Sequence, residues 1–120
     1  MKFLKASFQG WIYCRDHQTE CVNIVLKNGS LLGRGHQTWQ MNEIDKLVWP
    51  NPYGIGHVSN RDVSTTATIA KTYGVIKKLP SNAVTYQYAD KALDQLKKAG
   101  VDVWGKKWKP AVVHVTPSGK

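Results

Sequence analysis

The stretch Trp39–Gly56 reads WQMNEIDKLVWPNPYGIG and contains both an amphipathic helix and the signals that end it. Apolar side chains recur at helical spacing before the prolines, which predicts a helix from about residue 36 to residue 48. Pro50 and Pro52 each disfavour a helical conformation at the residue before them, and the two glycines that follow free the backbone again. We therefore predict a rigid aromatic loop after the helix, shaped to pack against another surface.

Helical spacing recurs along the rest of the chain and predicts a mainly α fold. The segment Ser59-Asn60-Arg61-Asp62 has the pattern of a capping box at the start of one helix. The apolar run Ala111–Val115 predicts a short C-terminal strand. No internal repeat or change of composition marks a boundary, so we expect residues 1–120 to form a single domain. The predicted helices, about five in number, cover residues 3–15, 16–28, 36–48, 59–74 and 85–99.

A chain of 120 residues, 42% of them hydrophobic, is long enough for one modest core. No apolar run in the sequence approaches the length of a membrane-spanning helix. The first residues, Met1–Lys5, carry charge, but no continuous apolar segment follows them. We therefore expect no signal peptide and a cytoplasmic location for the chain as it stands.

Seventeen basic against eight acidic side chains give a net charge of +9, which favours anionic partners such as nucleic acid, phosphate or an acidic protein. The densest basic group lies near the C-terminus and is interleaved with Trp104 and Trp108. Aromatic rings beside lysines can stack on bases while the lysines contact phosphates. The favoured interpretation of this group is nevertheless an ordinary solvated surface, with a nucleic-acid patch as the alternative. The basic group comprises Lys97, Lys98, Lys106, Lys107 and Lys109.

Cys14, His17 and Cys21 lie close together in the sequence. A structural zinc site needs four ligands, usually in two spaced pairs, so we expect no metal at these residues. A turn near Asp16 would also allow a disulfide. In a chain without a secretion signal, however, two cysteines are more often reduced, buried and apolar in character, and we expect free structural thiols.

The segment Gly33-Arg34-Gly35 lies between an apolar run and a helix, as the first part of a dinucleotide-binding loop does. The third glycine and a suitably placed acidic residue are missing, which favours a plain connection between helices. The free amides at the start of the helix, together with Arg34 and the helix dipole, would still attract an anion. The sequence contains no nucleophile elbow, Walker loop or metalloprotease signature, so we expect neither an enzyme nor a bound cofactor.

The tryptophans Trp11, Trp39 and Trp49 are best explained as core residues, because tryptophan supplies much of the buried area of a small helical protein. The alternative is a small-molecule cleft with an apolar floor and a few polar groups that fix the orientation of the ligand. The rim of that cleft would comprise Trp39, Asn42, Glu43, Trp49 and Tyr53.

Several short segments, in their order and spacing, resemble the C-terminal part of ABC-transporter substrate-binding proteins. They are Phe3–Ser7, Gly10-Trp11, Trp39–Gly56, Gly74–Lys78, Ala92-Leu93 and Val113–Pro117. The most similar branch of that family binds nitrate, alkanesulfonates or thiamine pyrimidine precursors. The resemblance covers nearly all of the chain and implies the C-terminal helical part of one lobe of a type II periplasmic binding protein. Members of the family have two α/β lobes and are considerably longer than this chain.

The resemblance implies a solute-binding protein, or a truncated derivative of one, that captures a small ligand without chemical change. Full-length relatives act in the periplasm and deliver the ligand to a membrane permease. The alternative, which the charge favours, is a small basic helical protein that binds nucleic acid or an acidic partner.

The resemblance also has a consequence for the oligomeric state. In the family, these helices pack on a sheet whose strands come largely from sequence that this chain lacks. The predicted strand Ala111–Val115 would have no partner, and a lone strand exposes unpaired amides. We therefore expect a homodimer, formed by pairing of this strand across a two-fold axis or by exchange of helices.

Overall fold

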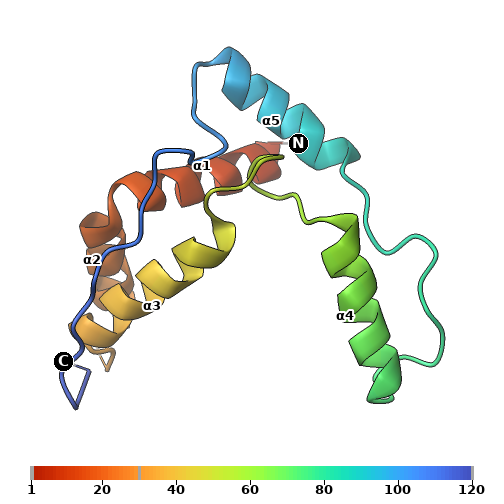
Figure 1. Cartoon of the computed structure of the whole chain (residues 1–120). Helices are drawn as coiled ribbons and strands as arrows, with labels where there is room; N and C mark the ends of the chain where they lie inside the picture. The colour runs from red at the N-terminus through yellow and green to blue at the C-terminus, as the bar shows by residue number, and fades with distance from the viewer. Residues whose placement is uncertain (1, 30, 120) are drawn as a thin grey trace.

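The computed structural model describes residues 2–29 and 31–119, and these residues form five α-helices and no strand (Figure 1). The prediction of a mainly α fold is confirmed. The helices are α1 (Lys2–Asp16), α2 (Gln18–Asn28), α3 (Arg34–Val48), α4 (Asn60–Thr72) and α5 (Gln87–Lys98).

The core lies where α5 crosses α1. The strongly amphipathic α5 buries Ala92, Leu93 and Leu96, and α1 contributes Phe8 and Ile12 from the facing side. Full burial of a leucine side chain contributes about 1.5–3 kcal/mol, so this crossing holds much of the fold together. The buried cluster consists of Phe8, Ile12, Trp49, Ile55, Ala89, Ala92, Leu93, Leu96 and Val103.

The loop after α3 packs against the chain's own C-terminal segment. The helix ends at Val48, as the prolines predict, and the Trp49–Pro50 peptide bond is cis. The backbone N–H of Asn51 donates to the carbonyl of Trp104 at 3.0 Å, and that of Ile55 donates to the carbonyl of Val103 at 3.1 Å. The surface that the rigid loop was predicted to meet is therefore residues 103–104.

The C-terminal tail is extended but forms no strand within the described residues, so the predicted strand Ala111–Val115 is not present there. The buried side chain of Asn42 explains the difference. Its Nδ2 donates to the carbonyl of Ala111 at 3.1 Å, and its Oδ1 accepts the Ala111 N–H at 2.8 Å. One side chain thus pairs both backbone groups of Ala111, the first residue of the predicted strand.

The helix α4 stands apart from the rest of the fold. Close contacts join α2 with α3, α1 with α5 and α1 with α2, whereas α4 points away from them (Figure 1). The radius of gyration is 17.0 Å, against about 14 Å for a compact chain of this length. We call residues 60–85, which comprise α4 and the segment that returns from it, the arm; none of them is buried.

The corner between α1 and α2 is closed by a disulfide between Cys14 and Cys21, so the expectation of free thiols is wrong. The two helices are separated by His17 alone, and this tight corner brings the two Cα atoms to 5.5 Å, within the range that a disulfide can bridge. Because the two sulfurs are bonded to each other, neither is available as a thiolate ligand for a metal.

Among the described residues, no helix combines the length and the apolar character needed to cross a bilayer.

Candidate functional site

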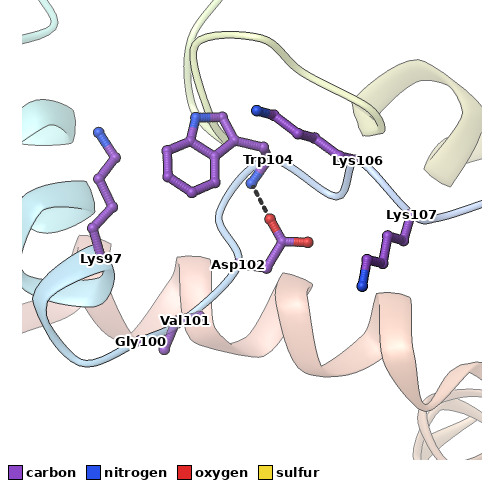
Figure 2. Close-up of a pocket in the computed structure, with 7 residues that line it drawn as sticks. All are labelled: Lys97, Gly100, Val101, Asp102, Trp104, Lys106 and Lys107. Atoms are coloured by element: carbon purple, nitrogen blue, oxygen red, sulfur yellow. Dashed lines mark hydrogen bonds between the residues drawn. The ribbon is translucent and has the colours of Figure 1, made fainter.

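The basic group near the C-terminus surrounds a cavity of about 460 Å³ beside the end of α5 (Figure 2). One wall is the last turn of α5 and the other is the loop that follows it. The lining residues are Lys97, Gly100, Val101, Asp102, Trp104, Lys106 and Lys107.

The loop begins where α5 is stopped by Gly100. This residue has a φ of +76°, a conformation that favours glycine. Its N–H donates to the carbonyl of Lys97 at 2.9 Å, and the N–H of Val101 donates to that of Leu96 at 3.0 Å, which closes the helix end. Two residues later, the fully buried Val103 fixes the loop to the core.

The indole ring of Trp104 is the centre of the cavity. The Nζ atom of Lys97 lies 5.5 Å from the ring centroid and that of Lys106 lies 5.4 Å from it, both within cation–π range. Figure 2 shows one lysine reaching the ring from α5 and the other from the loop itself. Trp104 is only partly buried, so the ring is held by the core and remains accessible.

The one carboxylate in the lining, that of Asp102, is occupied by the loop and by Arg15. Its Oδ1 accepts the backbone N–H groups of Trp104 at 3.0 Å and Gly105 at 3.1 Å. Its Oδ2 lies 3.7 Å from Arg15 Nη1. Asp102 is exposed, but these contacts offset part of its negative charge, and three lysines line the same cavity.

The buried side chain of Arg15 holds the loop against α1. Arg15 makes two hydrogen bonds to Asp16, at 2.7 and 2.9 Å, and donates to the carbonyl of Asp102 at 2.9 Å. The hydrogen bonds to Asp16 raise the pKa of Arg15. Its guanidinium also lies 4.7 Å from the centroid of the Trp49 ring. Gly105 has a φ of +63°, and a Cβ there would come within 2.7 Å of Trp49, so the loop requires glycine at this position.

A buried carboxylate lies on the other side of Trp49. Asp45 on α3 is fully buried, and this burial raises its pKa. The Gln18 amide donates to Asp45 Oδ2 at 2.7 Å and opposes the rise, as does the nearby indole N–H of Trp49. Asp45 Oδ1 and Trp49 Nε1 nonetheless have no partner with full hydrogen-bond geometry. Asp45 is therefore a buried carboxylate with only one of its two oxygens hydrogen-bonded.

A second cavity, of about 410 Å³, extends the basic surface toward the start of α2. It is lined by Trp108 and Lys109 from the tail, but also by Asp16 and Glu20, which makes its charge mixed. Lys98 is exposed on α5 and lines neither cavity. The structure therefore places Lys97, Lys106 and Lys107 in the lining of one cavity, the first two beside the Trp104 ring, and leaves Lys98 and Lys109 outside it.

The residues proposed for a ligand cleft do not meet in one place. Trp49 is 2% exposed and belongs to the core, as predicted, and Asn42 is buried against the tail. Glu43 pairs with Lys46 at 2.6 Å on the surface of α3. The contacts of Trp49, Asn42 and Glu43 therefore stabilise the fold, and the three side chains do not line a common cleft.

The other tryptophans differ from the prediction that they are core residues. Trp11 and Trp39 are each 41% exposed. Trp39 lies beside the ring of His36 near the start of α3, at a centroid distance of 5.8 Å. Helical spacing placed both residues on their helices correctly, but α1 and α3 turn these positions partly toward solvent.

Tyr53 lies beside a groove between α1, the end of α3 and the aromatic loop. The groove consists of two adjoining cavities, of about 300 and 330 Å³, which share Leu47, Val48, Asn51 and His57. Phe8 and Trp11 line the first cavity, and Tyr53 lines the second.

The predicted anion site at the start of α3 is partly filled by the chain itself. The His36 N–H donates to the carbonyl of Gly119 at 2.8 Å. Arg34 donates to Asn23 Oδ1 at 2.7 Å. One of the free amides and the one arginine of this site are thus already in use.

Sequence reasoning missed Arg15 and Asp102, the two residues that hold the loop in place. A signal for Asp102 was available, since an aspartate two residues before an aromatic and three before a glycine is typical of a side chain that accepts from its own turn. Arg15 gave no signal, because one arginine at the end of an amphipathic helix is usually exposed.

Comparison with models of protein families, with curated proteins and with solved structures finds no match to this chain. These comparisons neither support nor oppose the resemblance to substrate-binding proteins, and the function has to be argued from the site.

Proposed function

We propose that this protein binds single-stranded nucleic acid at the cavity around Trp104. The observation that carries the proposal is the position of two ammonium groups, from Lys97 and Lys106, at 5.5 and 5.4 Å from one accessible indole ring. A base stacks on the ring, and the lysines, whose side chains are long and flexible, move to the flanking phosphates. No reaction is assigned to the site.

The geometry supports a single strand rather than a duplex. Trp104 lies in a concave cavity of about 460 Å³, and a base has to leave its stack to enter it. A single strand already presents unstacked bases, whereas a duplex has to be opened first at a cost of a few kcal/mol per base. Lys107, which also lines the cavity, supplies a third positive charge (Figure 2).

Fluorescence anisotropy of a labelled oligothymidylate tests the proposal. Trp104→Leu is expected to weaken binding by about 5- to 150-fold, which corresponds to the 1–3 kcal/mol of one stacked base. Trp39→Leu is the matched control, because Trp39 is also accessible but lies on α3, outside the basic cavity. Circular dichroism confirms that each variant remains folded.

Equal losses in the two variants would contradict the proposal, as would an affinity for a hairpin duplex equal to that for the single strand. Tight binding that depends on salt but not on Trp104 would leave only non-specific attraction to the charge of +9.

A second candidate is the solute-binding function that the resemblance implies. One observation favours it: the apolar groove beside Tyr53 has polar groups, Asn51 and His57, at the junction of its two cavities, as small-molecule sites do. Thermal melting with nitrate, an alkanesulfonate or a thiamine pyrimidine precursor tests it. A rise in Tm that Tyr53→Ala abolishes would establish this function, and unchanged Tm values with all three would reject it.

We also propose that the protein matures in an oxidising compartment, in place of the cytoplasm expected from the sequence. The Cys14–Cys21 disulfide supports this location, because disulfides persist where the glutathione system does not reduce them. Alkylation of denatured, unreduced protein from its native cells tests this location. Alkylation of both cysteines would show that they are free thiols in the cell and would favour the cytoplasm instead.

A further inference from the structure

The far end of the arm, where α4 stops and the chain turns back, exposes large apolar side chains. Tyr73 is 80% exposed and Val75 is 77% exposed, and Ile69 and Leu79 are each more than half exposed. We call residues 69–79 the tip. Figure 1 shows α4 directed away from α1 and α5, so that the tip is carried outward from the body of the protein.

The tip is also basic and lacks acidic neighbours in the sequence. Lys71, Lys77 and Lys78 are all exposed. Between Asp62 and Asp90 the sequence contains no acidic residue. The lysines of the tip therefore have no carboxylate partner on their own segment, and they flank the exposed apolar side chains on both sides.

The base of the arm is fastened to the body. His57 Nε2 lies 2.7 Å from Asp90 Oδ1, and this contact joins the segment just before the arm to α5. The Tyr86 hydroxyl donates to the carbonyl of Val58 at 2.6 Å, and its ring stacks on that of His57. These contacts join the residues that flank the two ends of the arm to each other and to α5.

We propose that the tip docks on the surface of an anionic lipid bilayer. Tyr73, Val75 and Leu79 enter the boundary between headgroups and acyl chains, where apolar and aromatic side chains are favourable. The lysines remain at the level of the anionic headgroups, each contributing about a fivefold gain in affinity.

The pattern of side chains favours lipid over the other polyanion that this protein is proposed to bind. Phosphates of a nucleic acid would pair with the lysines but would leave Val75 and Leu79 in water. A bilayer satisfies both sets of groups at once, because it offers an anionic surface directly above an apolar layer. The proposal rests on residues of the arm and does not depend on the Trp104 cavity.

Co-sedimentation with lipid vesicles, performed on the full chain, tests the proposal. The vesicles contain phosphatidylcholine alone or phosphatidylcholine mixed with phosphatidylglycerol. Two triple variants each remove three positive charges. The tip triple is Lys71→Ala, Lys77→Ala and Lys78→Ala, and the pocket triple is Lys97→Ala, Lys106→Ala and Lys107→Ala.

The wild type is expected to bind the anionic vesicles and not the neutral ones. The tip triple is expected to lose about 100-fold in affinity for them, from three lysines at about fivefold each, and the pocket triple less than about tenfold. Equal losses in both triples would overturn the proposal, because the attraction would then follow net charge alone. No binding to the anionic vesicles would also overturn it.

A second pair of variants tests the apolar contribution. Val75→Ser in the tip is expected to weaken vesicle binding about tenfold, from the loss of its two methyl groups to water. Val112→Ser in the tail is the control, because Val112 is a similarly exposed valine, at 85%, that lies outside the tip. Indistinguishable binding of these two variants would overturn insertion of the tip.

Two further outcomes identify a different partner. Light scattering that shows twice the chain mass of 13.5 kDa, reduced to one chain by Val75→Ser, would make the tip an interface between copies instead. Loss of oligothymidylate binding in the tip triple would assign the tip to nucleic acid. The oligonucleotide assay on the pocket triple is separate, so failure of the lipid proposal is distinguishable from failure of the proposed function.

Discussion

The body and the arm of this protein are built from helices of similar length, yet only the body has a core. In the body, α5 buries Ala89, Ala92, Leu93 and Leu96 against α1. In the arm, α4 carries an apolar stripe of Val63, Ala67 and Ala70 and buries none of it. The difference is not visible in the helical pattern alone. It depends on whether the rest of the chain supplies a facing surface.

The contrast has a physical consequence for stability. The buried cluster joins α1, α5 and the loop after α3, and α2 packs on both α1 and α3, so the body should unfold as one unit. In contrast, α4 depends on its own hydrogen bonds and its capping residue. The Ser59 hydroxyl accepts the N–H of Asp62 at 3.1 Å, which satisfies one free amide at the start of α4. Segments with few buried contacts open at low free energy, so the arm is expected to open locally without unfolding the body.

The largest expected effect comes from the aromatic residue at the end of α3. Trp49→Ala should lower the free energy of unfolding by about 3 kcal/mol or more, because it empties the core beneath Arg15 and Gly105. Tyr73→Ala, at the tip of the arm, should change it by less than about 0.5 kcal/mol. Chemical denaturation monitored by circular dichroism measures both. A loss below about 1 kcal/mol for Trp49→Ala would mean that the core is elsewhere.

The disulfide is expected to have the next largest effect. Replacing Cys14 and Cys21 together by serine should destabilise the body by about 2.5 kcal/mol, the chain-entropy estimate for a loop with a sequence separation of 7. Denaturation of the wild type with and without a reducing agent gives an independent measurement. If reduction left the unfolding midpoint unchanged, the corner between α1 and α2 would be held by its other contacts.

Glycine substitutions in the two regions sharpen the comparison. Ala92→Gly in α5 should lower the free energy of global unfolding by about 2 kcal/mol, since it removes a buried methyl group and weakens the helix. Ala67→Gly in α4 weakens its helix by about 1 kcal/mol, but global unfolding should hardly change. Amide hydrogen exchange should show the difference as faster exchange confined to residues 60–72. A smaller loss of global unfolding free energy in Ala92→Gly than in Ala67→Gly would contradict this assignment of the core to the body.

A smaller effect is expected from pH. Burial raises the pKa of Asp45 above its value in the unfolded chain, so the native state binds this proton more tightly than the unfolded state does. The stability that protonation of Asp45 contributes is gained as the pH falls through the native pKa toward the unfolded value of about 3.9. The stability of the wild type relative to Asp45→Asn should therefore increase on acidification. A difference that stays constant or decreases would show that Asp45 is not desolvated.

Local signals in the sequence predicted the helices and the stop at Val48, because both depend on neighbours within a few residues. The grouping of Lys97 with Lys106 and Lys107 was also accessible, since one short loop separates them. The hydrogen bonds between Asn42 and the tail could not be predicted, because Asn42 and Ala111 are 69 residues apart. An asparagine on a helix gives no sign of a partner so distant in the sequence.

The disulfide and the open arm were missed for a different reason. A spacing of seven residues between Cys14 and Cys21 is compatible with free thiols and with a disulfide, and only the sharp corner at His17 decides between them. The helix α4 has the capping residue and apolar spacing of a packed helix. Whether it packs depends on surfaces that the arm itself does not contain.

The salt dependence of oligothymidylate binding tests the central claim, that single strands bind the lysines around Trp104, most directly. Each phosphate contact on a single strand changes the slope of log K against log salt concentration by about −0.7. The pocket triple is therefore expected to make the slope shallower by about 2, while the tip triple, with the same loss of charge, leaves the slope within about 0.7 of the wild type. Equal changes in the two variants, or a larger change in the tip triple, would contradict the claim.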